Sequence, residues 1–222
     1  MKQEVIIVAG GQGQRMHSAL PKQFLLLGGK PVLMHSIECF FCYDSSIHIV
    51  LVLPENQLGY WEELKSAYQF NIPHDVVTGG NERFFSVQNG LTHISGNSLV
   101  AVHDGVRPFV SDETLHRCFD GAEKYGNAVP CCKVNDSMRQ VTQQKNCAVD
   151  RSVFRVIQTP QVFRSDILVK AYEQDFSARF TDDASVVEIL GENIHLVDGN
   201  IENIKITTTF DLLVGEALIK SP

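Results

Sequence analysis

Short runs of valine, isoleucine and leucine alternate with segments of helical periodicity along most of this chain, and this alternation constrains its fold more than any other feature. The runs predict strands at residues 3–8, 47–53, 74–77, 99–103, 128–132 and 194–197. Helices are predicted at residues 31–41, 55–68, 82–94, 111–125 and 182–190, and also after residues 165 and 209. Strands that are apolar almost throughout are typical of a parallel sheet covered on both faces. The sequence therefore predicts a doubly wound, mostly parallel α/β fold.

The composition of the 222-residue chain is that of a globular protein, with 44% hydrophobic and 20% charged residues. We expect residues 1–222 to form a single domain. Nineteen Lys and Arg residues against 26 Asp and Glu residues give a net charge of -7, which argues against broad binding to nucleic acid or anionic lipid. No apolar run approaches the ~20 residues of a membrane-spanning helix. The first residues lack the pattern of a signal peptide, so a cytoplasmic protein is predicted.

The six cysteines and eight histidines are not expected to form disulfides or a metal site. Cys39 and Cys42 form an isolated C-x-x-C in an apolar helical segment, so we expect both to be buried as free thiols. The histidines lack the spacing of zinc ligands. His103 is expected to be structural.

Residues 133–149 interrupt the alternation of strands and helices. This segment is rich in asparagine, glutamine and lysine and offers little material for a core. It is predicted to project from the sheet as an arm, and regular structure is expected to resume at residues 154–158.

The glycine-rich segment A-G-G-Q-G-Q-R-M, residues 9–16, follows the first predicted strand. Such a loop lets backbone N–H groups approach phosphate oxygens closely. A dinucleotide-binding G-x-G-x-x-G anchored on its last two glycines would need glycine at position 16, where this chain has Met16, so NAD or FAD binding is disfavoured. The pattern G-x-x-x-x-G-K-[ST] also fails, because Arg15 and Lys22 stand at the wrong offsets.

Charged residues next to these turns are candidates for phosphate chemistry. Arg15 and Lys22 can converge on one anion beside the glycine loop, although two solvated surface charges are the alternative. Asp104 ends the strand predicted at residues 99–103, where a carboxylate can hold a metal ion or a sugar hydroxyl. Arg107 follows in the same turn. The alternative for this pair is a helix-capping aspartate with a structural arginine.

Six motifs, in their order along the chain, carry a family resemblance. They are A-G-G-Q-G-Q-R-M followed after five residues by P-K-Q-F, G-G-N-E-R-x-x-S-V from residue 79, H-D-G-V-R-P-F, V-D-R, Q-T-P-Q-V-F and N-I-K-I-T. Together they resemble the sugar-phosphate cytidylyltransferases over nearly the whole chain. The chain has V-A-G-G where that family often has P-A-A-G, D-G-V-R-P where D-A-A-R-P is frequent, and Ser137 where threonine is frequent.

The resemblance implies a nucleotidyltransferase fold and a role for each candidate residue. CTP, the co-substrate, would be bound by Ala9, Gly10, Gly11, Gly13, Arg15, Lys22, Gly80, Ser86 and Asp104. Arg15 and Lys22 would stabilise the transition state, and Asp104 would lie near the ribose and a Mg²⁺ ion. The sugar phosphate would be bound by Asp104, Arg107, Ser137, Arg151, Thr159, Thr181 and Lys205. Arg151 and Lys205 would also be catalytic because they place this substrate.

The resemblance also implies a homodimer in which the arm reaches the partner subunit. Arg151 and Thr181 would then serve the active site of the other subunit. The motif V-D-R before Q-T-P-Q favours 2-C-methyl-D-erythritol 4-phosphate as the acceptor, with pyrophosphate released in nonmevalonate isoprenoid precursor synthesis. Ribitol 5-phosphate is the alternative acceptor, because enzymes for that substrate share the A-G-G loop and the P-K-Q-F segment.

Two alternatives come from other functional classes. A nicotinamide-dependent oxidoreductase is disfavoured by Met16. A catalytically silent nucleotide-binding partner protein is disfavoured by the intact set of basic residues. We therefore expect small-molecule partners, CTP and a sugar or polyol phosphate, rather than a nucleic acid or a membrane.

Overall fold

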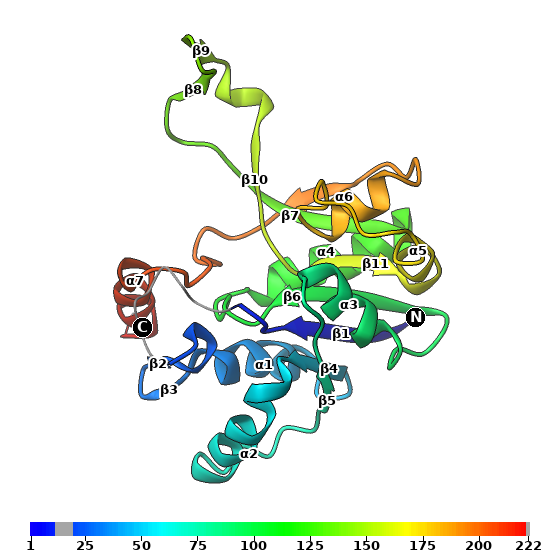
Figure 1. Cartoon of the computed structure of the whole chain (residues 1–222), viewed down its shortest axis with the longest axis vertical. Coiled ribbons are helices and arrows are strands. Elements are labelled where there is room, and N and C mark those ends of the chain that lie inside the picture. The colour runs from blue at the N-terminus through cyan, green and yellow to red at the C-terminus, as the bar shows by residue number, and fades with distance from the viewer. Residues whose placement is uncertain (12–19, 221–222) are drawn as a thin grey trace.

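The computed structural model describes residues 1–11 and 20–220, and its centre is an eight-stranded sheet (Figure 1). The strand order is β10-β7-β11-β6-β1-β4-β5, and β12 pairs with β7. These strands are β1 (Lys2–Val8), β4 (His48–Leu53), β5 (Asp75–Thr78), β6 (Ser98–Asp104), β7 (Asn127–Lys133), β10 (Arg155–Ile157), β11 (Gln161–Arg164) and β12 (Leu196–Asp198). β1 pairs in parallel with both β6 and β4, and β4 with β5. The prediction of a mostly parallel sheet is confirmed.

Helices cover both faces of the sheet. They are α1 (Val32–Tyr43), α2 (Leu58–Ala67), α3 (Arg83–Leu91), α4 (Asp112–Tyr125), α5 (Ser165–Ala171), α6 (Asp183–Glu188) and α7 (Thr209–Lys220). Neighbouring residues of a strand point to opposite faces, so Val5 and Ile7 of β1 pack in one core with α1, α2 and α4. Ile6 packs in a second core with α3, α5 and α6. The doubly wound arrangement is therefore confirmed.

Two strands of the sheet are not among the predicted strands: β10, within residues 154–158 where only regular structure was expected, and β11. β11 lies between β6 and β7 and is antiparallel to both. Its four residues, Q-V-F-R, are too few to show a periodic pattern, although Val162 and Phe163 are fully buried. Because β11 enters the sheet beside β6, the residues just before it lie next to the end of that strand.

The polar segment after β7 projects from the body of the molecule and is longer than predicted. β8 (Met138–Val141) and β9 (Asn146–Val149) form an antiparallel hairpin far from the sheet (Figure 1). The one-turn 3-10 helix Arg151–Val153 belongs to the same projection, because pairing with β7 resumes only at β10. We call residues 134–154 the arm. The projection therefore continues past residue 149, where the predicted arm ends.

The cysteines are all free thiols, but their burial differs from the prediction. Cys39 is partly buried, whereas Cys42 is exposed. Phe40 is fully buried in the core, and a residue two positions later on an α-helix is rotated by about 200°, which turns Cys42 outward. The expectation of burial was wrong for Cys42. In the described part of the chain, no helix is long and apolar enough to cross a membrane.

A glycine sets how closely α3 approaches the sheet. A Cβ atom at Gly90 would lie 2.7 Å from Cγ2 of Ile6 and 3.2 Å from Cγ2 of Val52. Both neighbours are buried strand residues that cannot move aside freely. Because the first turn of α3 carries Arg83 and Ser86, this close approach also fixes the position of those two residues relative to β1.

We predict that Gly90→Val destabilises the fold by about 1–3 kcal/mol, because the new side chain overpacks the contact between α3 and β1. The matched control is Gly59→Val in α2, where no atom lies within 4 Å of an added Cβ. Urea unfolding of both variants measures the difference. Equal unfolding midpoints for the two variants would show that the approach of α3 is not limited by Gly90.

Candidate active site

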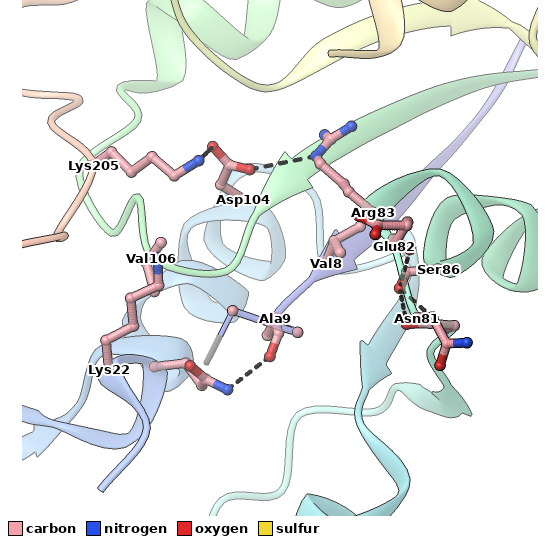
Figure 2. A pocket seen from close by; sticks show the side chains of 14 residues that line it. Val8, Ala9, Lys22, Asn81, Glu82, Arg83, Ser86, Asp104, Val106 and Lys205 are labelled. Atoms are coloured by element: carbon pink, nitrogen blue, oxygen red, sulfur yellow. Dashed lines mark hydrogen bonds and ion pairs between the residues drawn. The ribbon is translucent and has the colours of Figure 1, made fainter. Parts of the chain in front are cut away.

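A pocket of about 280 Å³ opens at the carboxyl ends of β1 and β6, where ligands bind in sheets of this type (Figure 2). It brings together eight of the predicted site residues: Ala9, Gly10, Gly11, Lys22, Gly80, Ser86, Asp104 and Lys205. The other residues that line it are Val8, Gln23, Asn81, Glu82, Arg83 and Val106. Segments from the start, the middle and the end of the chain therefore form one site.

The glycine loop after β1 is held from below by a buried glutamine. Gln23 is fully buried, and its Nε2 donates hydrogen bonds to the carbonyl oxygen of Ala9 at 2.7 Å and to Oε1 of Gln57 at 2.6 Å. The N–H of Ala9 donates to the carbonyl of Val52 in β4 at 3.0 Å. A Cβ at Gly11 would lie 2.9 Å from Cε of Lys22, so the lysine side chain lies against the loop. The start of the loop is thus fixed relative to the sheet, and the Lys22 side chain lies against it.

The turn before α3 requires a glycine at position 80. A Cβ there would lie 2.3 Å from Cβ of Phe85, closer than any real contact of this kind. The Gly80 N–H donates a 3.2 Å hydrogen bond to Oγ of Ser86, and that hydroxyl donates to the carbonyl of Glu82 at 3.1 Å. The Ser86 side chain therefore closes the turn and leaves the backbone of Gly80 at the wall of the pocket.

Asp104 lies between three cationic side chains at the end of β6. Lys205 Nζ and Arg107 Nε approach its Oδ2 at 3.0 Å and 3.1 Å. On the other side, Arg83 Nε lies 3.8 Å from Oδ1. Figure 2 shows the carboxylate between Lys205 and Arg83. Asp104 and Arg107, which lie in one turn, are therefore an ion pair within a larger cluster.

The charge of Asp104 follows from this arrangement. Burial raises the pKa of the Asp104 carboxyl, but Arg83, Lys205 and Arg107 together outweigh that effect and hold it well below its usual range. The carboxylate is therefore ionised across the physiological pH range. It offers the pocket a fixed negative charge surrounded by positive charge.

A buried hydrogen-bond chain supports Asp104 from beneath the pocket. His103 Nε2 lies 2.9 Å from the carbonyl oxygen of Arg107, which can only accept, so this nitrogen carries the proton. His103 Nδ1 then accepts from the Thr159 hydroxyl at 3.1 Å, and the same hydroxyl accepts from the Asp104 N–H at 3.1 Å. His103 is structural, as predicted. The Thr159 hydroxyl is therefore bonded to Asp104 and His103, and Thr159 is not among the residues that line the pocket.

The remaining candidate residues are not gathered in this pocket. Gly13 and Arg15 lie outside the described residues. Ser137 and Arg151 lie on the arm, where Arg151 Nη1 donates to the carbonyl of Asn135. Thr181 lines a separate cavity next to α6. Within one chain, the β8–β9 hairpin of the arm lies away from β1 and the body of the sheet (Figure 1).

The sequence alone assigned no role to Arg83, although this residue lies in the motif G-G-N-E-R. Its guanidinium forms two 2.7 Å hydrogen bonds with the carboxylate of Asp183, one hundred positions away in the sequence. The motif was a usable signal for Arg83. The segment T-D-D gave no sign that its second aspartate, Asp183, would be fully buried next to the site.

The family of the chain is given by its similarity to known proteins. The model of the family described as 2-C-methyl-D-erythritol 4-phosphate cytidylyltransferase matches residues 4–221. The chain belongs to this family. Like the other 2-C-methyl-D-erythritol 4-phosphate cytidylyltransferases, it is therefore a nucleotidyltransferase enzyme.

Several relatives with this name match along their whole length. The 2-C-methyl-D-erythritol 4-phosphate cytidylyltransferase of Bacteroides thetaiotaomicron is 51% identical over 219 residues, covering 99% of this chain and 100% of the relative. That of Azobacteroides pseudotrichonymphae is 52% identical over 222 residues with the same coverage. The crystal structure of the enzyme with this name from Thermus thermophilus has a TM-score of 0.82 and 30% identity, covering 100% of both chains. These comparisons favour neither the ribitol phosphate alternative nor an oxidoreductase.

We predict that His103 makes the stability of this cytidylyltransferase depend on pH between about 4 and 6.5. Burial lowers the pKa of His103 to about 4 from 6.5, so in this range the unfolded chain binds a proton that the folded chain does not. The contribution of His103 to the free energy of unfolding is therefore fully present above pH 6.5 and is lost as the pH falls toward 4. His103→Gln should reduce the slope of unfolding free energy against pH by about one proton, or ~1.4 kcal/mol per pH unit.

Urea unfolding at several pH values in this range measures that slope. The control is His93→Gln at an exposed histidine, which should leave the slope as in the wild type. An unchanged slope for His103→Gln would mean that His103 is not held neutral by its surroundings.

Proposed function

We propose that this chain transfers the cytidylyl group of CTP to the phosphate of 2-C-methyl-D-erythritol 4-phosphate and releases pyrophosphate, a step of isoprenoid precursor synthesis. The observation that carries this proposal is the pocket itself. A glycine loop and Lys22 lie across from a cluster of three cations around one carboxylate. The chain that builds this pocket is about half identical, end to end, to cytidylyltransferases for this acceptor.

The reaction needs no nucleophile from the protein. A phosphomonoester is mostly dianionic near pH 7, since its second pKa is about 6, so an oxygen of the acceptor phosphate can attack the α-phosphorus of CTP directly. A new P–O bond forms, the bond to the leaving pyrophosphate breaks, and no proton has to be removed. The main obstacle is the approach of two anions, which fixed positive charge overcomes.

The nucleotide is proposed to lie along the glycine loop and the turn before α3. Backbone N–H groups of Gly10, Gly11 and Gly13 would face the phosphates, with Arg15 and Lys22 at the oxygens that gain charge in the transition state. Gly80 and Ser86 would bound the cytosine, and Asp104 would meet the ribose. Support comes from the position of Lys22 against Gly11 and from the exposed backbone at Gly80.

We propose that a Mg²⁺ ion would be held in this pocket, with Asp104 as its protein ligand. No group of three or more metal-ligating side chains occurs among the described residues. Mg²⁺ does not need one, because it is commonly held by one or two carboxylates together with substrate phosphates. Asp104 is ionised and lines the pocket, with Glu82 as a second carboxylate in the lining. When bound, the ion would supply positive charge that neutralises the triphosphate.

The acceptor phosphate is proposed to lie beside Lys205, on the side of Asp104 away from Arg83. Lys205 is 41% exposed and its Nζ reaches Asp104, so the ammonium can turn toward an incoming phosphate. Arg107 lies on the same side. Thr159 would act here through Asp104, since its hydroxyl holds the N–H of that residue.

The other acceptor residues are proposed to come from a partner subunit in a homodimer. Ser137 and Arg151 lie on the arm, which stands away from its own pocket (Figure 1). The arm exposes Val141, Val153 and Phe154, with Val141 and Val153 each 74% exposed. Apolar side chains on a two-stranded hairpin need cover, because such a hairpin is barely stable in water by itself. Arg151 and Thr181 would then complete the site of the partner.

We predict that the purified protein releases pyrophosphate from CTP with 2-C-methyl-D-erythritol 4-phosphate and not with ribitol 5-phosphate. Lys22→Ala should lower kcat by roughly 10²–10³, the loss typical of one transition-state contact. A coupled pyrophosphate assay with each acceptor measures both effects. Lys170→Ala, at an exposed lysine of α5, is the control and should keep full activity. Preference for ribitol phosphate, or a Lys22→Ala variant with normal kcat, would refute the respective assignment.

We predict that two inactive variants restore each other when they form mixed dimers. In a dimer of Lys22→Ala and Arg151→Ala subunits, one site would combine an intact pocket with an intact arm. Random mixing should therefore recover about a quarter of wild-type activity. A mixture of Lys22→Ala and Lys205→Ala is the matched control and should stay inactive, because both residues belong to the same pocket. Absence of recovery in the first mixture would place Arg151 in the site of its own chain.

A further inference from the structure

Arg83 lies at the wall between two cavities and contacts two carboxylates. It lines the pocket at the glycine loop and also the neighbouring cavity next to α6. Its Nη1 and Nη2 donate to Oδ1 and Oδ2 of Asp183 at 2.7 Å each, while its Nε faces Oδ1 of Asp104 at 3.8 Å. The proposed reaction gives this residue no role.

Asp183 holds the guanidinium of Arg83 in one position. It is fully buried at the first residue of α6, and its Oδ1 also accepts a 2.6 Å hydrogen bond from the Tyr172 hydroxyl. Two parallel hydrogen bonds between an arginine and a carboxylate fix the plane of the guanidinium as well as its distance. Burial lowers the pKa of Arg83, but the charge and hydrogen bonds of Asp183 raise it well above its usual range, so the residue stays charged.

The cations at Asp104 differ in how freely they can move. Lys205 is 41% exposed and ends in a single ammonium, whereas the side chain of Arg83 is 30% exposed and is hydrogen-bonded to a buried residue. On the proposed function, an acceptor phosphate attracts Lys205 away from Oδ2 of Asp104. Arg83 cannot turn toward the phosphate without breaking both of its hydrogen bonds to Asp183.

We propose that Arg83 is a positioning residue, held in place by Asp183 and Tyr172. It fixes Oδ1 of Asp104 and so keeps this carboxylate in place for CTP while Lys205 turns to the acceptor phosphate. This inference rests on the proposed function. It links a buried aspartate of α6 to the nucleotide site through one side chain, in the order Tyr172, Asp183, Arg83, Asp104.

A purely structural role for Arg83 makes a different prediction. In that case Arg83 only neutralises Asp183, and removal of both charges would cost nothing in catalysis. Arg83→Gln alone leaves the Asp183 carboxylate buried without a counter-charge, which is strongly destabilising. The double variant Arg83→Gln/Asp183→Asn removes that problem, because two neutral side chains remain that can hydrogen-bond to each other.

The decisive experiment compares stability with CTP affinity in the same variants. For Arg83→Gln/Asp183→Asn we expect a Tm close to that of the wild type, but a KM for CTP raised about tenfold, the effect of losing one charged contact. The KM for 2-C-methyl-D-erythritol 4-phosphate should change by less than about threefold, since Asp104 is placed at the nucleotide. A wild-type KM for CTP in the double variant would overturn the proposal.

Two further variants give independent readings. Arg83→Lys keeps the charge next to Asp183, but one ammonium cannot reach both carboxylates with the geometry of a guanidinium. It should also fold normally and raise the KM for CTP, and a wild-type value would likewise overturn the proposal. Tyr172→Phe removes one oxygen from the chain of contacts and should raise this KM about two- to threefold. Arg164→Gln breaks an exposed Arg–Asp pair of the same chemistry on the surface and should change nothing.

Calorimetric titration with CTP separates this inference from the proposed function. If the wild type releases no pyrophosphate with the proposed acceptor, the proposed function fails, and the CTP affinity of the same variants still tests the role of Arg83. Weaker CTP binding by Arg83→Lys and by the double variant supports positioning. Equal binding by all variants refutes it, whatever the acceptor is.

Discussion

The organisation of this site depends on one buried carboxylate and the three cations around it. Asp104 is 7% exposed, and such a charge can remain ionised only with close partners. Arg83, Arg107 and Lys205 supply them from three different segments of the chain. The carboxylate therefore gathers basic side chains that would otherwise repel one another, and so concentrates positive charge where two phosphate-bearing substrates are proposed to meet.

The sheet brings these segments together. β1 and β6 are parallel neighbours, so the glycine loop and Asp104 emerge at the same edge. β11 enters from the opposite direction and places Thr159 directly beneath Asp104, where its hydroxyl joins the backbone of Asp104 to the neutral His103. The antiparallel strand is therefore the reason that Asp104 has support from below as well as partners on both sides.

Sequence reasoning found the parts of the site that lie within short motifs, but not the pairings between motifs. Gly10, Gly11, Lys22 and Asp104 follow predicted strands, and the rule that ligands bind at the carboxyl ends of strands was enough to gather them. The Arg83–Asp183 pair could not be found in this way, because no local pattern reports which two residues a hundred positions apart will be buried together. The same holds for β11, whose four residues become a strand only because β6 and β7 leave a space between them.

The two sides of Asp104 suggest a division of labour in the site. On the side of Oδ2, Lys205 is exposed enough to exchange a carboxylate partner for a phosphate. On the side of Oδ1, Arg83 is held by Asp183, which is fully buried, so water cannot take the place of Arg83 as the partner of this carboxylate. A site that must bind one polyanion firmly and then accept a second uses both kinds of cation, because Arg83 at Oδ1 and Arg107 at Oδ2 keep the carboxylate paired when Lys205 turns to the second anion. By this argument the buried Asp183 of α6 contributes to the nucleotide site, although α6 itself lies on the far side of Arg83.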